Sequence, residues 1–450
     1  MSLRKNLISN GLANGLQKVV RLVEQLALVP LFLHFWGAAY YGEYLTITAI
    51  PAILAFTDFG VGAAGANTFV LRYAAAEYAG AAAVAKANFL ILLGLIGVAL
   101  LAAGVALSLL DVSPYLPHAV IGKSEGAIAF VALFTSRLLG FLFQPLEAFF
   151  RAVRKAAIGL YFQVGYAVAR MAVAALVIVM GGHIVEVAVS DVTVTIVFGV
   201  IYYFCARAQL PGFSVWGATV HRAEAMSLLK TGAGFFLIPA WQAVFFQGTT
   251  LVVRATLGPE AVTIFNTLRT LCRSISQLLG MISNSVFPEL QVEWATGNKD
   301  KARMLFRTAF AGTLVVSVAG VVVLYLLGPT IYHLWTRGAL NPSPLLWAYF
   351  LASVLLSSMW WTGAMVQRAV NRPFGVAFVG FLGAVASVVA SRFLSESQGL
   401  EGAALGSLLL DIVMSIYVLP AACRLLLQPL RLLPRETVAD LAMMWRKRLG

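Results

Sequence analysis

The chain alternates long apolar runs with short polar segments. Each run continues for about 20 residues, the length of helix that crosses a hydrocarbon core of about 30 Å. None shows the alternating polarity of strands in a membrane barrel. The pattern therefore predicts an all-α polytopic membrane protein with twelve spanning helices. Their approximate bounds are 15–36, 43–65, 87–109, 127–149, 157–180, 186–206, 231–253, 261–288, 307–327, 345–367, 373–394 and 401–423.

The composition supports the membrane assignment. Of the 450 residues, 60% are hydrophobic and 11% are charged, whereas roughly a quarter of the residues in a soluble domain are charged. The 3 cysteines lie in or beside apolar runs, and the 5 histidines are scattered. No pair of them has metal-ligand spacing. We therefore expect neither a metal site nor a cofactor, and we predict no cleaved signal peptide at the N-terminus.

The basic residues predict the orientation of the chain. If the N-terminus is cytoplasmic, 23 of the 32 lysines and arginines fall in cytoplasmic segments and 4 in outer loops. This asymmetry predicts that both termini lie in the cytoplasm. It also explains the net charge of +13 without a nucleic-acid partner. Residues 67–86 and the tail after Pro434 are amphipathic, which favours helices lying on anionic lipid headgroups.

Two short sequence echoes indicate an internal repeat. RAVRK at 151–155 and RAVNR at 368–372 lie at equivalent cytoplasmic exits, six helices apart. A second echo joins the segment around Gly37 to the segment around Gly258. Two six-helix halves in parallel are typical of transporters that bind substrate between the halves and rock them. The predicted division is an N-lobe at 1–210, a linker at 211–230, a C-lobe at 231–423 and a basic tail at 424–450.

Five arginines lie inside the predicted spans, where a charge usually marks a cavity or a partner. They are Arg21, Arg137, Arg170, Arg269 and Arg273. Arg269 and Arg273 are four residues apart, so they share one face of their helix with Gln277. Two guanidinium groups at this spacing repel each other unless an anion or water lies between them.

The alternative interpretation is that each arginine pairs with a buried acid and only holds helices together. Glu24 and Asp411 are the acids expected to be deep, whereas Asp191 is expected near the outer end. Arginines at mid-depth therefore outnumber acids, which favours a cavity for an anion. Arginine suits phosphate because its planar fork can donate two hydrogen bonds. Any ion coupling would then run through Glu24 or Asp411.

Several segments resemble bacterial polysaccharide flippases. They are Phe35-Trp36-Gly37 with Tyr41-Gly42-Glu43-Tyr44, Asp58-Phe59-Gly60-Val61-Gly62, Leu257-Gly258-Pro259-Glu260-Ala261-Val262, Val286-Phe287-Pro288-Glu289 and Lys299-Asp300-Lys301-Ala302-Arg303. The whole chain is similar to the MOP superfamily, within it the O-antigen or Wzx-type branch.

The resemblance implies two six-helix lobes in a MATE-like fold around a central cavity. It also implies transfer of an undecaprenyl-pyrophosphate-linked oligosaccharide to the outer leaflet of the bacterial inner membrane, for O-antigen or exopolysaccharide synthesis. A polysaccharide polymerase is then a candidate partner, and cationic cavity residues would meet the pyrophosphate. Lipid II flippases usually have fourteen helices, and the twelve predicted here count against that assignment.

Two other functions remain open. A cation-coupled multidrug exporter of the same fold would favour acids at mid-depth, whereas arginine dominates here. A membrane glycan polymerase or ligase would be an enzyme, and such enzymes typically need a sizeable outer domain. The predicted outer loops are at most about 17 residues long, which favours a transporter.

Overall fold

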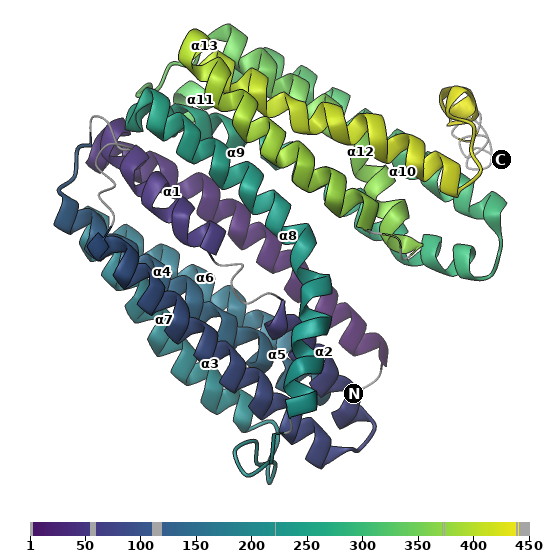
Figure 1. Cartoon of the computed structure of the whole chain (residues 1–450). Helices are drawn as coiled ribbons and strands as arrows, with labels where there is room; N and C mark the ends of the chain where they lie inside the picture. The colour runs from purple at the N-terminus through teal and green to yellow at the C-terminus, as the bar shows by residue number, and fades with distance from the viewer. Residues whose placement is uncertain are drawn as a thin grey trace. The chain divides into compact units, whose positions relative to one another are not determined.

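The computed structural model describes residues 3–54, 60–109, 119–220, 222–370, 372, 374–437 and 440, and these contain helices and no strand. Figure 1 shows the helices in chain order. They are α1 (Leu3–Leu54), α2 (Val61–Ala74), α3 (Tyr78–Leu109), α4 (Lys123–Leu139), α5 (Phe143–Ala152), α6 (Ala156–Val179), α7 (Ile184–Arg207), α8 (Arg222–Leu257), α9 (Pro259–Ala295), α10 (Lys299–Leu326), α11 (Gly328–Trp335), α12 (Pro344–Ala369) and α13 (Phe374–Leu425). Short 3₁₀ turns lie at Gly140–Leu142 and Leu430–Leu432, and residues 433–437 are again helical.

Seven helices of the described chain are long and apolar enough to cross a membrane. They are Tyr78–Leu109, Lys123–Ala152, Ala156–Val179, Ile184–Arg207, Lys299–Leu326, Pro344–Ala369 and Phe374–Leu425. Large apolar side chains on these helices face outward; for example, Leu101 and Leu109 of α3 are 70% and 78% exposed. Such surface suits a hydrocarbon solvent rather than water. The predicted fold class, an all-α polytopic membrane protein, is confirmed.

Two of the longest helices each contain parts of two predicted spans. Helix α1 breaks at Gly37, where φ is +73°, and α13 breaks at Gly399, where φ is +62°. Glycine has no Cβ and tolerates this left-handed conformation at little cost. The chain can therefore reverse from one span into the next with almost no intervening loop.

The predictions for residues 43–65 and 67–86 are wrong in detail, because neither is one continuous helix. Helix α1 ends at Leu54, and α2 begins after Gly60, whose φ is +71°. A turn through Ala76 then separates α2 from α3. Phe69 of α2 is buried in a cluster with Phe149 of α5, so this helix packs on protein as well as facing the membrane surface.

The two sequence echoes share backbone geometry. Helix α5 ends at Ala152 and α12 at Ala369, the alanines of the two RAV motifs. After each helix the amide of the basic residue, Lys155 or Arg372, donates to a carbonyl five residues earlier at 2.8 Å. This bond satisfies a helix-end carbonyl that would otherwise have no partner. In the second echo, Gly37 and Gly258 both have positive φ.

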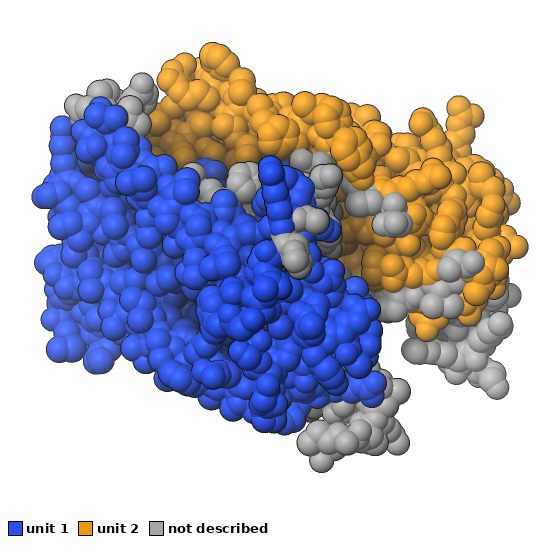
Figure 2. Space-filling view, turned by 60° about the horizontal axis from the view of Figure 1, so that its bottom comes forward, with its two compact units in different colours: residues 1–243, 258–260 blue, residues 244–257, 261–450 orange. Residues whose placement is uncertain are grey.

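The chain forms two compact units, coloured separately in Figure 2. Unit 1 comprises residues 1–243 and 258–260, and unit 2 comprises 244–257 and 261–450. A buried cluster in unit 1 joins α2, α3, α5 and α7, and another in unit 2 joins α9, α10, α12 and α13. Each unit therefore has its own core.

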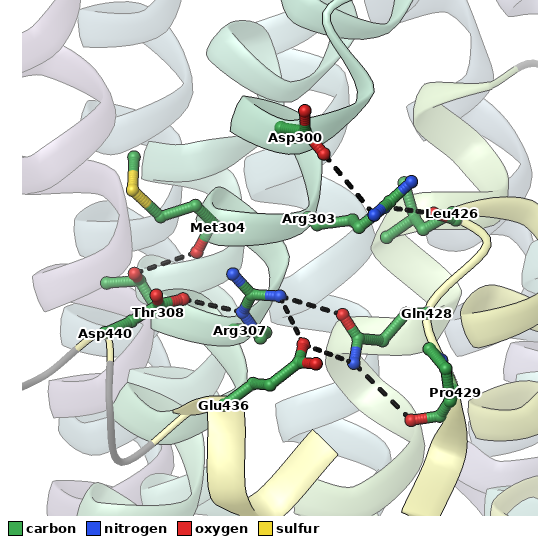
Figure 3. Close-up of polar contacts among 10 residues, drawn as sticks. All are labelled: Asp300, Arg303, Met304, Arg307, Thr308, Leu426, Gln428, Pro429, Glu436 and Asp440. Carbon is green, nitrogen blue, oxygen red and sulfur yellow. Dashed lines mark hydrogen bonds and ion pairs between the residues drawn. The ribbon is translucent and has the colours of Figure 1, made fainter. Parts of the chain in front are cut away.

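The segment after α13 is fixed to α10 through Arg307 (Figure 3). Its guanidinium donates to Asp440 at 2.6 Å, to Glu436 at 2.7 Å and to Gln428 at 2.9 Å. Gln428 also donates to Glu436 at 2.9 Å. This network holds the start of the tail against unit 2. The predicted amphipathic positions from Leu441 onward lie outside the described residues, as does Val438.

Candidate functional site

Helices α8 and α9 provide a polar cluster inside unit 2. Thr249 and Thr250 lie on α8 and are buried, and Asn266 and Arg269 lie on α9. The threonines interrupt an apolar stretch, and Asn266 and Arg269 are three residues apart on one face. The antiparallel course of the two helices brings the four side chains together.

Arg269 uses its fork to bind three neutral oxygen atoms. One terminal nitrogen donates to Thr249 Oγ1 at 2.8 Å. The other donates to Thr250 Oγ1 at 2.8 Å and to Asn266 Oδ1. Thr250 also donates to Asn266 Oδ1 at 3.0 Å, which orients the acceptors. The guanidinium is therefore fixed in place while its full positive charge is retained.

Arg273 has a different environment one turn further along α9. Its side chain is exposed, and its Cζ lies 4.2 Å from the centroid of the Phe246 ring. Arg269 shares that ring at 5.4 Å and also lies 5.2 Å from the Phe265 ring. An aromatic face attracts a cation through its quadrupole, but it carries no net charge. Phe246 thus supports both guanidinium groups without neutralising either.

The arginine pair, Arg269 and Arg273, has no acidic partner within the described part of the chain. The ion pairs formed there involve other residues. Gln277 follows Arg273 by one further turn and is exposed on the same helix. The arrangement leaves two positive charges on one face, with a neutral hydrogen-bonding side chain beside them.

The buried arginine of unit 1, in contrast, has an acidic partner. Arg170 on α6 donates to Asp191 on α7 at 2.5 Å, and both side chains are mostly buried. The guanidinium also lies 5.4 Å from the Tyr166 ring, and the Tyr166 hydroxyl contacts Thr195 at 2.7 Å. The interpretation in which a buried arginine pairs with an acid therefore holds for Arg170. Asp191 is seven residues, or about 10 Å, into α7, which is within reach of Arg170 on the adjacent helix.

Arg137 and Glu24 belong to the same region of unit 1. Arg137 on α4 is partly buried, and its charge acts on Asp191 together with that of Arg170. The negative charge of Glu24 on α1 interacts electrostatically with Arg170. The side chain of Tyr44 lies within electrostatic reach of all four charged groups: Arg137, Arg170, Asp191 and Glu24. This charged cluster of unit 1 therefore combines two arginines with two acids. The side chain of Arg21 lies outside what the structure describes.

Asp411 on α13 is a buried acid of unit 2. Its carboxylate accepts hydrogen bonds from Ser353 Oγ at 2.5 Å and from Trp360 Nε1 at 3.0 Å, both on α12. It is 5% exposed, and none of the ion pairs within the described residues includes it. A carboxylate bound only by neutral donors can take up a proton without breaking an ion pair.

Sequence reasoning did not identify Thr249, Thr250, Phe246 or Phe265 as parts of the site. The signal available was the polar interruption Gln247-Gly248-Thr249-Thr250 within an apolar helix. Periodicity could not connect it to α9, because the contact depends on how two helices pack. In the described residues no group of three histidine, cysteine, aspartate or glutamate side chains could hold a metal ion.

Comparison with known proteins finds likeness in structure only. No family model and no curated protein sequence matches the chain. An inward-facing multidrug resistance MATE family transporter of the MOP superfamily matches with a TM-score of 0.72 and 12% identity, over 91% of this chain and 94% of that one. The lipid II flippase MurJ, in an inward closed conformation, matches with a TM-score of 0.70 and 13% identity, over 98% and 92%.

A third match is a MOP superfamily transporter from Pyrococcus furiosus, described as having a binding pocket of reverse polarity that suggests a different function. It has a TM-score of 0.65 and 13% identity, over 96% of each chain. At such low sequence identity, the structural matches show a shared fold and do not show a shared substrate. Across nearly its whole length, the chain has the fold shared by MOP superfamily transporters.

Proposed function

We propose that this chain is a flippase, and not an enzyme, that moves an undecaprenyl-pyrophosphate-linked oligosaccharide across the inner membrane by alternating access. The observation that carries the proposal is the arginine pair of unit 2, which has no acidic partner within the described residues. The lipid II flippase among the similar structures supports transport of a lipid-linked substrate on this fold.

The physical argument begins with the cost of charge within a membrane-spanning helix. Placing an arginine near the bilayer centre costs roughly 2.5–3.5 kcal/mol on insertion scales, and two arginines one turn apart add their mutual repulsion. Among the described residues, the groups that contact Arg269 and Arg273 are hydroxyls, an amide and aromatic rings. An anion with two adjacent negative groups would relieve this cost, and a pyrophosphate provides that geometry.

The two arginines have separate roles in this proposal. Arg269 donates hydrogen bonds to Thr249, Thr250 and Asn266, so its positive charge is held in a fixed position. Arg273 is exposed and makes no side-chain hydrogen bond to the described residues, so its donors are free for a phosphate. Gln277 extends the surface by one turn and can donate or accept with a sugar. Arg21 and Arg137 of unit 1 remain candidate substrate contacts, whereas Arg170 is bound to Asp191.

Coupling to protons, if transport requires it, is assigned to Asp411. It is buried and bound by Ser353 and Trp360, and protonation would exchange a charge for a neutral group inside unit 2. Glu24 is the second candidate, but its negative charge interacts with the positive charge of Arg170. It therefore belongs to the charged cluster of unit 1, in which acids offset arginines.

The cellular setting follows from the same proposal. The chain would lie in a bacterial inner membrane with both ends cytoplasmic, and it would serve O-antigen or exopolysaccharide synthesis. A polysaccharide polymerase would use the product in the outer leaflet. Beyond the docked segment at Arg307, the basic residues of the tail would contact anionic lipids.

The test is reconstitution in liposomes that contain a fluorescent pyrophosphate-linked glycolipid, with leaflet access read by a membrane-impermeant quencher. We expect the wild-type chain to equilibrate the glycolipid between leaflets. Arg273→Gln should lose this activity while keeping its melting temperature, and the control Arg392→Gln, at an exposed position of α13 before its break at Gly399, should keep both. Wild-type transport by Arg273→Gln would overturn the proposal.

A multidrug exporter of the same fold is the second candidate. Asp411 and the adjacent ring pair Trp360–Trp361, whose centroids are 5.3 Å apart, are features that would suit an organic cation. The same liposomes, loaded with a fluorescent cationic dye and given a proton gradient, distinguish the two. Dye export that is abolished by Asp411→Asn, together with no glycolipid movement, would favour the exporter.

A further inference from the structure

Unit 1 carries an apolar groove that the arginine clusters do not use. It has a volume of about 560 Å³ and lies between α3, α5 and α7, with the loop after α7 at one end. Phe89, Leu139, Phe143 and Gly199 are among its lining residues, and Trp216 lies at the loop end. Its walls are almost entirely hydrocarbon, so it suits an apolar chain rather than a sugar or a phosphate.

The groove is a built feature of the fold. Gly199 on α7 leaves space in the groove, because a larger side chain at this position would project into it. A Cβ added at Gly199 would lie 3.4 Å from the Phe143 ring. The loop 208–220 is fixed at the end of the groove by Lys86, whose Nζ donates to the carbonyls of Trp216 at 2.9 Å and Ala218 at 2.8 Å. The Trp216 and Phe89 rings lie 6.3 Å apart.

The length of the groove matches one leaflet. Its lining on α7 runs from Thr195 to Phe204. Nine residues of helix span about 14 Å. Half of the hydrocarbon core is about 15 Å. Trp216 and Tyr203 at the loop end are the residue types that favour the membrane–water interface.

The loop end of the groove is also basic. Arg207 lines the small pocket that shares Phe89, Tyr203 and Trp216 with the groove. Lys155 lies close by, donating to Gln209 at 2.9 Å. The sequence has no acidic residue between 192 and 223, and the Arg207 guanidinium makes no ion pair or hydrogen bond with the described residues. A negative headgroup at Arg207 would therefore meet positive charge on this part of the chain.

We propose that this groove binds one acyl chain of an anionic phospholipid from the leaflet on the basic side, with the lipid phosphate at Arg207. The charge at one end, the interfacial aromatic residues and the one-leaflet length together define this ligand. A polyprenyl chain is far longer than one leaflet and would not be contained. The site would hold a resident lipid on unit 1, whatever substrate the arginine pair takes.

The experiment uses the full chain in vesicles of neutral phospholipid that contain a small fraction of phosphatidylglycerol with a photoreactive acyl chain. After illumination, labelled peptides are mapped by mass spectrometry. We expect labels concentrated on 196–204 and 89–93. Arg207→Gln should lower this labelling by about tenfold, the effect of losing a charge-assisted hydrogen bond to phosphate.

Gly199→Leu should remove the labelling by filling the groove, and Val200→Trp gives a second way to fill it if the first variant folds poorly. The matched controls are Gly104→Leu, on an exposed part of α3 with open space around it, and Lys299→Gln in unit 2. Both should label as the wild type does. Even labelling of all membrane-exposed helices would overturn the proposal. So would loss of the label to an excess of polyprenyl phosphate but not to unlabelled phosphatidylglycerol.

Discussion

The two units both place arginines within long helices, but they balance the charge differently. In unit 1, Arg170 is bound to Asp191, and the described side chains of its cluster, with Arg137 and Glu24, include as many acids as bases. In unit 2, Arg269 and Arg273 are surrounded by hydroxyls, an amide and aromatic rings. Residues of the same type therefore have different surroundings.

The difference separates a structural role from a binding role. A buried ion pair satisfies its own charges, and removal of one partner leaves the other uncompensated. An arginine pair held by neutral groups keeps its charge available for a ligand. Substitutions in unit 1 should therefore affect stability, whereas substitutions at Arg273 should affect transport in molecules that are still folded.

The largest effect should come from reversing the charge of the exposed arginine. Arg273→Glu should abolish glycolipid transport, because it places a carboxylate where the phosphate would bind. Arg273→Ala should lose about 2–5 kcal/mol of interaction, the cost of truncating one partner of a buried charge pair. Arg273→Lys should lose less, since it keeps the charge but not the fork. Transport per folded molecule in liposomes measures all three, and an unaltered rate in Arg273→Ala would remove this residue from the substrate path.

The next effect tests the balanced cluster. Arg170→Ala should destabilise the protein by about 3–5 kcal/mol, because it leaves Asp191 buried without its partner. Replacing both, in Arg170→Met with Asp191→Leu, should recover most of the loss. Thermal unfolding in detergent measures the stability, and transport per folded molecule should stay near wild type. If transport were lost while stability was kept, Arg170 would belong with the substrate site instead.

A smaller effect tests how Arg269 is held. Thr249→Val with Thr250→Val removes two hydroxyl acceptors and keeps the shape of the side chains. Each hydrogen bond to a charged group contributes about 1.5–3 kcal/mol, so we expect transport to fall by roughly tenfold or more. Thr256→Val is the control, since its hydroxyl bonds only to the Val252 carbonyl of its own helix. Equal rates for the double variant and the control would contradict the role given to the two threonines.

The smallest expected change in stability is at Asp411. Asn Oδ1 can still accept from Trp360, and its NH2 group can donate to Ser353 Oγ, so Asp411→Asn should unfold within about 1 kcal/mol of wild type. If this acid couples transport to protons, the variant should lose the dependence of the transport rate on pH between 6 and 8. Asp300→Asn, at a side chain 92% exposed, is the control. A retained pH dependence in Asp411→Asn would move the coupling elsewhere.

The helices could be predicted because their signal is local. Twenty consecutive apolar residues must form a helix in a bilayer, where every backbone group needs a partner within its own segment. The break before α2 was missed, because Gly60, whose φ is +71°, lies within a mostly apolar stretch that carries no strong local break signal. The RAV echoes did predict equivalent helix ends, because the same residues close the same backbone hydrogen bond.

The candidate site was predictable only along single helices. The spacing of Arg269 and Arg273 follows from helical periodicity, and so does their common face with Gln277. The pairing of Arg170 with Asp191 does not, because the two residues are 21 positions apart and meet only when α6 and α7 pack side by side. The same limit hid Phe246 and the two threonines on α8.

By itself the sequence determined that this chain is a helical membrane protein, and it predicted two similar halves and more arginines at mid-depth than acids. These properties depend on composition and on periodicities of a few residues. The tertiary structure decided which arginines are neutralised. An ion pair needs two groups within about 4 Å, and that distance between residues on different helices is set by packing. Helix packing therefore distinguishes the paired Arg170 from the exposed Arg273, although the sequence presents both as one charge in an apolar run.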